Sequence, residues 1–184
     1  MIGLLRCAVT KFKSDRDITM TTVIETQMLI RRSVNIVFNA FVDPLITTKF
    51  WFSQSSGYLE KGAMVDWTWD KYQITHSTHV LQVVENELIC IEWGTPKTKV
   101  DFVFEKIDSM NTYVIIRNYD IELQGNELIH YVMDATGGFT TVLDGAKAWL
   151  EYDIQLNLVE DKFPPFLLRS HQRSFLERSS LNSK

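Results

Sequence analysis

The sequence lacks any long hydrophobic run and is poor in cysteine. No stretch approaches the roughly 18 consecutive apolar residues that a membrane-spanning helix needs, so we expect no membrane span. The apolar patch at the N-terminus is too short for the apolar region of a signal peptide. Cys7 and Cys90 form no recognisable disulfide framework, which favours a reducing, cytoplasmic environment.

Several signatures of chemistry are also missing. The sequence contains no phosphate-binding loop, no nucleotide-binding glycine motif and no GxSxG motif. His76 and His79 are three residues apart in a predicted strand and therefore point to opposite faces, so they cannot both bind one metal ion. We expect neither a metal nor a cofactor, and no catalytic residue is assigned.

Charge is distributed unevenly along the chain. Residues 20–165 carry 11 Lys and Arg against 20 Asp and Glu, a net charge of −9, whereas residues 1–19 carry +2 and residues 166–184 carry +3, which gives −4 for the chain. Nucleic-acid phosphates would be repelled by so acidic a central part, so nucleic acid is not an expected partner.

What is present is the composition of one globular domain. The 184 residues are 45% hydrophobic and 23% charged, enough for a single domain with a proper core. Regular patterning begins after Met20 and fades after Pro165. We therefore predict a disordered extension over residues 1–19, a domain over residues 20–165, and a basic tail over residues 166–184 that is disordered or forms a short helix.

The first part of the domain reads as a strand over residues 22–30 followed by two short helices. Ser33 is a candidate N-cap, and Asp43-Pro44 ends the first helix and can begin the second. After these helices the period of the hydrophobic pattern changes from near 3.6 residues to 2. The predicted strands that follow cover residues 57–61, 63–70, 72–84, 87–93, 99–107 and 112–120.

The domain ends in helix. Residues 125–134 offer a first apolar face, Gly137-Gly138 is expected to interrupt it as a hinge, and an apolar stripe then continues over residues 139–161 up to Phe163. Consecutive strands joined by short turns indicate an antiparallel meander. We thus predict an α+β helix-grip fold, in which a curved sheet of six to seven strands surrounds a long C-terminal helix.

Several motifs resemble the SRPBCC (START-like) superfamily. The likeness is to the branch of the C-terminal domain of the activator of the heat-shock-90 ATPase, whose bacterial members are often labelled polyketide-cyclase-like. It covers about residues 22–165 and is carried by Phe41-Val42-Asp43-Pro44, Trp51-Phe52, residues 65–69, residues 89–93, Gly137-Gly138-Phe139-Thr140, Gly145-Ala146-Lys147-Ala148 and residues 156–159. The resemblance implies the helix-grip fold with an internal cavity, and no single function.

The candidate binding residues follow from the predicted faces. Tryptophan side chains combine a large apolar surface with one N–H donor, which suits the wall of a ligand cavity as well as a core. His76 could add a polar contact and Arg117 an interior cation for a ligand carboxylate, although Arg117 could equally be an edge charge. The proposed lining is Trp67, Trp69, His76, Trp93, Phe102, Phe104, Arg117 and, from the last helix, Trp149.

The leading functional interpretation is binding of a small hydrophobic or amphipathic molecule in a cavity between the sheet and the last helix, with Ala146 leaving room for it. A polyketide-cyclase-like or hydrolase-like enzyme is an alternative, and it would need an acid–base group such as His76 inside the cavity. A co-regulator of a chaperone ATPase is the other alternative.

Overall fold

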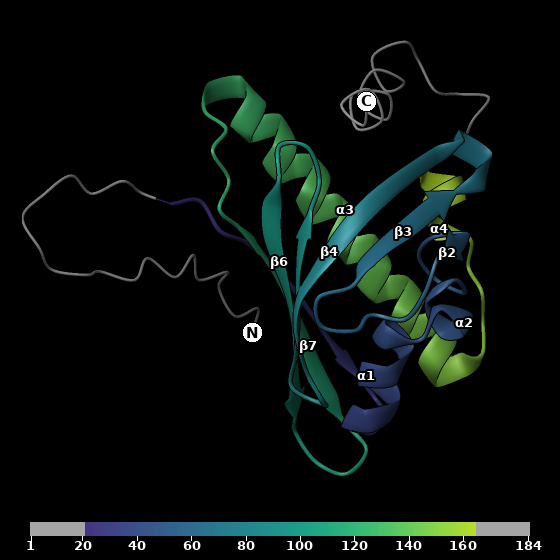
Figure 1. Cartoon of the computed structure of the whole chain (residues 1–184). Coiled ribbons are helices and arrows are strands. Elements are labelled where there is room, and N and C mark those ends of the chain that lie inside the picture. The colour runs from purple at the N-terminus through teal and green to yellow at the C-terminus, as the bar shows by residue number, and fades with distance from the viewer. Residues whose placement is uncertain (1–20, 165–184) are drawn as a thin grey trace, which may run out of the picture.

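The computed structural model describes residues 21–164, in one layer of sheet and one of helices (Figure 1). The predicted extension, the predicted tail and Cys7 lie outside the described residues. In chain order the elements are β1 (Ile24–Ile30), α1 (Val34–Val42), α2 (Pro44–Thr47), β2 (Gln54–Ser55), β3 (Met64–Trp69), the 3₁₀ turn η1 (Asp70–Tyr72), β4 (Ile74–Val84), β5 (Leu88–Trp93), β6 (Thr98–Lys106), β7 (Thr112–Tyr119), α3 (Gly125–Tyr152) and α4 (Leu158–Lys162).

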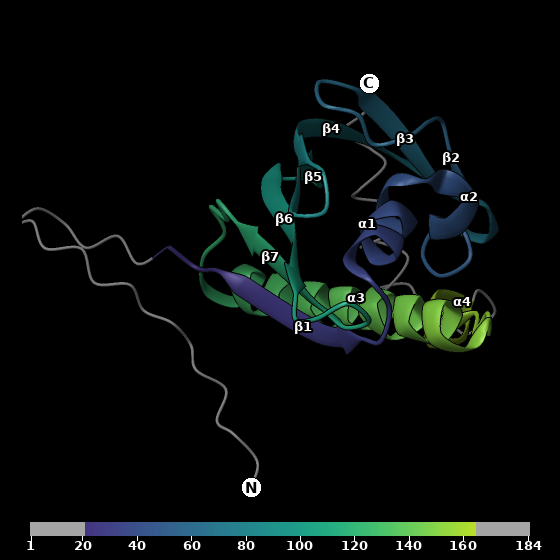
Figure 2. The same cartoon turned by 90° about the horizontal axis from the view of Figure 1, so that it is seen from below.

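The seven strands form one antiparallel sheet in the order β1-β7-β6-β5-β4-β3-β2. Figure 2 shows the sheet curling around α1, with α3 lying along β1 and β7. One bend has a local cause, because the pairing of β4 with β5 shifts between Val80 and Gln82 and the extra residue strengthens the twist. The predicted helix-grip architecture is confirmed.

Alternation along the strands builds the buried face. Ile89 on β5 pairs with Phe102 on β6, which pairs with Ile116 on β7, and all three side chains are buried. Their immediate neighbours along each strand point to the other face, since side chains in a strand alternate with a period of two. The apolar row therefore crosses three strands on the concave side.

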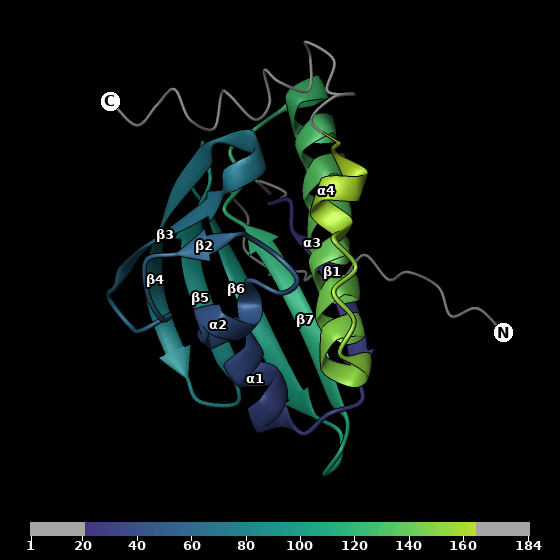
Figure 3. The same ribbon diagram turned by 90° about the vertical axis from the view of Figure 1, so that its right-hand side faces the viewer.

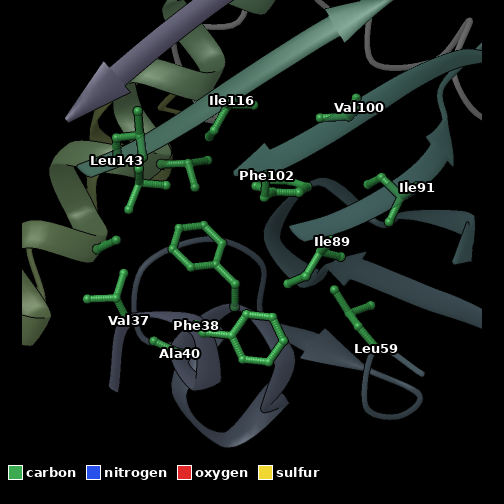
Figure 4. Close-up of a cluster of buried hydrophobic side chains, with 14 of the residues drawn as sticks. Val37, Phe38, Ala40, Leu59, Ile89, Ile91, Val100, Phe102, Ile116 and Leu143 are labelled. Atoms are coloured by element: carbon green, nitrogen blue, oxygen red, sulfur yellow. The ribbon is translucent and has the colours of Figure 1, made fainter. Parts of the chain in front are cut away.

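The two short helices fill the hollow of the sheet. Asp43 has the extended backbone expected before proline, and its Oδ1 accepts a hydrogen bond from the Leu45 N–H at 2.9 Å, so it caps α2 with Pro44 at the first helical position. In Figure 4, Val37 and Phe38 of α1 and Leu143 of α3 lie in one cluster with Ile89, Phe102 and Ile116. The hollow is thus a packed core.

The last helix differs from the prediction in two places, at the glycine pair and at its C-terminal end. α3 runs unbroken through Gly137-Gly138, so the expected hinge is wrong. It stops at Tyr152, nine residues before the predicted end at residue 161, because Asp153 adopts a left-handed conformation with φ 59°. The segment that follows turns back along α3 as α4 (Figure 3).

Two strand predictions also need correction. Residues 57–61 form no strand; the short strand is β2, and Leu59 nevertheless packs in the core. Tyr72 belongs to η1 rather than to β4, because Gln73 takes a left-handed backbone conformation (φ 55°) that separates the two.

The free edge of β1 is capped by polar groups of α3. Lys147 Nζ donates to the Leu29 carbonyl at 2.7 Å, and the Arg31 N–H donates to Glu151 Oε1 at 2.7 Å. Burial of the Glu151 carboxylate acts to raise its pKa, but the hydrogen bonds from Lys147 and Arg31 outweigh burial and lower it. These contacts occupy backbone groups that would otherwise offer an edge for pairing.

Candidate functional site

Four of the predicted site residues form one aromatic cluster on the concave face. The Trp93 ring lies 5.5 Å from Trp67, 6.1 Å from Trp69 and 5.6 Å from His76, measured between ring centroids. The cluster comes from the adjacent ends of β3, β4 and β5, where Trp67 of β3 pairs directly with His76 of β4. Trp51, which precedes β2, joins it at 4.8 Å from Trp67.

His76 is inserted between two of these indoles. Its ring is stacked on Trp93 with an interplanar angle of 24° and meets Trp69 edge-on at 84°. Burial among apolar rings lowers the pKa of His76 below its ordinary value, because the charged imidazolium loses hydration there. His76 is therefore neutral at pH 7, and His79 lies on the opposite face, as its spacing predicts.

Phe102 reaches the cluster through Trp51, with 5.8 Å between the ring centroids, and the structure separates Phe104, Arg117 and Trp149 from it. Phe102 and Phe104 pack against Phe41 of α1, and Phe104 also meets Phe38 edge-on at 5.3 Å. Trp149 lies near the end of α3, half-buried, with Lys49 Nζ 6.0 Å from its ring centroid.

Of the two roles considered for Arg117, that of an interior cation is wrong. The buried side chains of β7 that face the helices include Val114, Ile116 and Asn118, so Arg117 projects from the convex side. There its Nε donates to Glu25 Oε2 of β1 at 2.7 Å, with both side chains partly exposed. The sequence phase of β7 was ambiguous because Ile115, on the convex side, is also apolar and buried.

The expected cavity beside Ala146 is also wrong. Ala146 is 0% exposed, Trp67 and Phe102 are each 1% exposed, and Phe104 is 4% exposed, so no cavity the size of a water molecule lies against these side chains. Phe38 and Phe41 of α1 occupy that volume. The apolar pattern predicts the last helix as the cover of the sheet and does not show that these two rings of the first helix fill the space beneath it.

An open pocket lies instead at the edge of the aromatic cluster. It has a volume of about 260 Å³ and lies among the loop after α2, the turn between β3 and β4, α3, and the segment that leads into α4. It is lined by residues 48–53, Trp69, Lys71, Tyr72, Gly145 and residues 155–160. Of the predicted site residues only Trp69 reaches it, joined by Trp51 and Phe52.

Close backbone packing sets one wall of this pocket. Gly145 of α3 has no side chain, and a Cβ there would lie 3.0 Å from the Phe50 carbonyl oxygen and 3.1 Å from the Phe50 Cβ. Glycine at residue 145 therefore allows this close approach of the loop to the helix.

Polar contacts hold α4 over the opposite wall. Tyr72 Oη lies 2.8 Å from the Phe163 carbonyl oxygen, and burial and the carboxylates of Glu160 and Asp161 raise its pKa, so it remains a protonated donor. Lys71 forms an ion pair with Glu160. No sequence signal points to these roles, because Tyr72 continues the alternation of the predicted strand and residues 158–161 continue the spacing of the predicted last helix.

A hydrogen-bonded network that was also missed ties α3 to the sheet. Tyr131 Oη donates to Asn118 Oδ1 at 2.8 Å, and Asn118 Nδ2 donates to Thr98 Oγ1 at 2.8 Å. Asn118 and Thr98 are buried, so the network satisfies polar groups that would be costly to leave unpaired. Its role is to fix the first half of α3 above β6 and β7.

Within residues 21–164, no three His, Cys, Asp or Glu side chains come together as a metal site would require. Cys90 lies on the convex face, where burial raises the pKa of its thiol to about 11. None of the helices in this range is long and apolar enough to cross a membrane.

Comparison with known proteins places these features in a family. The family described as Activator of Hsp90 ATPase homolog 1-like protein matches residues 31–151. No curated protein gives a significant match.

Solved structures share the fold. Protein SSP2350 from Staphylococcus saprophyticus is 26% identical over 73% of this chain and 96% of its own, with a TM-score of 0.66. Aha1 from Colwellia psychrerythraea, whose structure is a dimer, is 16% identical over 71% and 97%, with a TM-score of 0.61. DynU16, from the dynemicin biosynthetic locus, is 13% identical over 72% and 48%, also with a TM-score of 0.61. Since the family match spans most of the domain, the chain belongs to the Activator of Hsp90 ATPase homolog 1-like protein family.

Proposed function

We propose that this domain binds a small amphipathic molecule in the pocket beside the aromatic cluster. The observation that carries the proposal is the pairing of an aromatic wall, made by Trp51, Phe52 and Trp69, with a polar rim that includes Lys49 and Tyr72. Ligand pockets commonly combine apolar walls with a few polar groups in this way. At about 260 Å³ the pocket is slightly smaller than the usual range of roughly 300–1,000 Å³, which suits a compact ligand.

Binding is favoured over catalysis by the surroundings of His76. A general base needs reach to a substrate proton and usually a partner that orients it. The neighbours of His76 are the rings of Trp69 and Trp93, and burial lowers its pKa without a carboxylate contribution. No feature of the described residues favours chaperone regulation, the function that the family's description suggests.

The test is binding of the neutral apolar dye N-phenyl-1-naphthylamine to the full chain. We expect dye emission to rise on binding, and a dye concentration of 100 times the dissociation constant to add about 2.7 kcal/mol of apparent stability. Gln155→Trp should fill the pocket mouth and weaken dye binding, because Gln155 is an exposed lining residue.

The matched control is Gln27→Trp. Gln27 is exposed on the convex side of β1, away from the pocket, so this variant should bind the dye as the unmodified chain does. Equal dye affinity in the Gln155→Trp and Gln27→Trp variants would contradict the proposal.

A further inference from the structure

Lys49 differs from the other cations of the described domain. Six Lys and Arg side chains form ion pairs with carboxylates, and Arg32 and Lys162 donate to carbonyl oxygens. Within residues 21–164 this leaves Lys49, Lys61 and Lys106 without an ion pair or hydrogen bond. Of these three, only Lys49 lines the pocket.

The Lys49 ammonium lies near an aromatic ring rather than beside an anion. Its Nζ lies 6.0 Å from the centroid of the Trp149 ring, at the outer limit of a cation–π contact. Such a contact orients the ammonium but leaves its charge uncompensated. The N–H groups of Lys49 can therefore still donate to an anionic partner.

The charge of the pocket is opposite to that of the domain around it. Its charged lining residues are Lys49, Lys71 and Glu160, and Lys71 is already paired with Glu160. The pocket thus carries a net charge of +1, from two lysines and one glutamate, whereas residues 21–164 carry −9, from 11 basic and 20 acidic residues.

From these observations we infer that the pocket selects amphipathic molecules with an acidic group, and that Lys49 at its rim binds that group. The inference rests on the proposed function and names its ligand class. The apolar part of the ligand lies against Trp51 and Trp69, and its carboxylate or a similar anion pairs with the Lys49 ammonium.

The test compares three compounds with one eight-carbon chain and different head groups: sodium octanoate, 1-octanol and octylammonium chloride. Each is titrated into the ¹⁵N-labelled full chain at pH 7, and amide shifts of the lining residues give its affinity. We expect octanoate to bind most tightly and octylammonium least. Because pairs of exposed charges contribute modestly, Lys49→Met should weaken octanoate binding about two- to fivefold and leave octanol binding unchanged.

Two further variants sharpen the result. Lys106→Met removes an exposed lysine at the end of β6, outside the pocket, and should leave all three affinities unchanged. Lys49→Glu should reverse the preference, so that octylammonium binds more tightly than octanoate.

The outcomes separate the two proposals. If octanol and octanoate bind equally well, or if Lys106→Met weakens octanoate as much as Lys49→Met does, the acid preference is wrong while ligand binding stands. If none of the three compounds shifts the amides of the lining residues, the proposed function itself is overturned.

Discussion

The His76 imidazole is surrounded by indole rings, and this sets its protonation. The lowered pKa means that the unfolded chain binds a proton on His76 more readily than the folded chain does. The sign of the effect on stability follows from linkage: His76 favours the folded state fully above its unfolded pKa of about 6.5, and this contribution is lost as pH falls toward the folded pKa.

This predicts a pH dependence that one substitution removes. Between pH 7.5 and 5.5 the melting temperature of the unmodified chain should fall more than that of His76→Phe, which keeps a ring against Trp93 but cannot be protonated. Thermal unfolding of both proteins at the two pH values measures the difference. A smaller fall in the unmodified chain would show that a cation–π contact with Trp93 outweighs the lost hydration.

At this scale the sequence predicted some orientations and missed others. The inward phase of Trp67, Trp69 and His76 could be predicted, because polar or exposed residues alternate with them along β3 and β4. The orientation of Arg117 could not be predicted, because β7 has buried apolar residues on both faces. Alternation determines a face only where the other face is polar.

Among the elements, α3 has two glycines, Gly138 and Gly145 of its four, whose surroundings are opposite. A Cβ on Gly145 would lie 3.0 Å from the Phe50 carbonyl oxygen, whereas a Cβ on Gly138 would meet no atom within 4 Å. Both lie in the interior of the helix, where alanine is preferred to glycine by about 1 kcal/mol. Alanine substitutions at the two positions therefore separate the effect of helix propensity on stability from the effect of packing.

We expect Gly138→Ala and Gly145→Ala to shift stability in opposite directions. Gly138→Ala should raise the free energy of unfolding by about 0.5–1 kcal/mol. Gly145→Ala should lower it by about 1–2 kcal/mol, since the overpacking of backbone against backbone exceeds the propensity gain. It should also weaken N-phenyl-1-naphthylamine binding, because the loop at Phe50 forms a pocket wall. Urea unfolding of both variants tests this, and stabilisation of both would show that the loop yields freely.

The elements themselves were predictable in kind and order but not at their ends. Period and capping residues located α1, α2 and most strands, because these signals are local. The end of α3 was missed because Leu156 and Val159 continue its helical spacing past Tyr152, although Asp153 leaves the helix. The pocket depends on that missed turn, since residues 155–160 line it only by folding back along α3.

For the whole molecule, the core and the pocket come from the same continuous stretch of chain. Among the described residues, the buried core cluster runs from Ile30 to Ala146, and the pocket lining ends at Glu160. The packing of α1 into the sheet determines where a pocket remains. That packing depends on contacts between residues that are far apart in sequence. The sequence could therefore predict the fold more readily than the position of its pocket.

The last prediction is that residues 20–165 alone form the folded, ligand-binding domain. The shortened chain should unfold cooperatively, with a melting temperature within a few degrees of the full chain, and should bind N-phenyl-1-naphthylamine equally well. Removing both ends changes the net charge from −4 to −9, so the comparison is made at 0.15 M salt, where the Debye length is about 8 Å and self-repulsion is screened. A lower melting temperature or weaker dye binding that is restored at higher salt would reflect charge alone. Loss of cooperative unfolding at every salt concentration would instead show that one of the removed ends packs against the core.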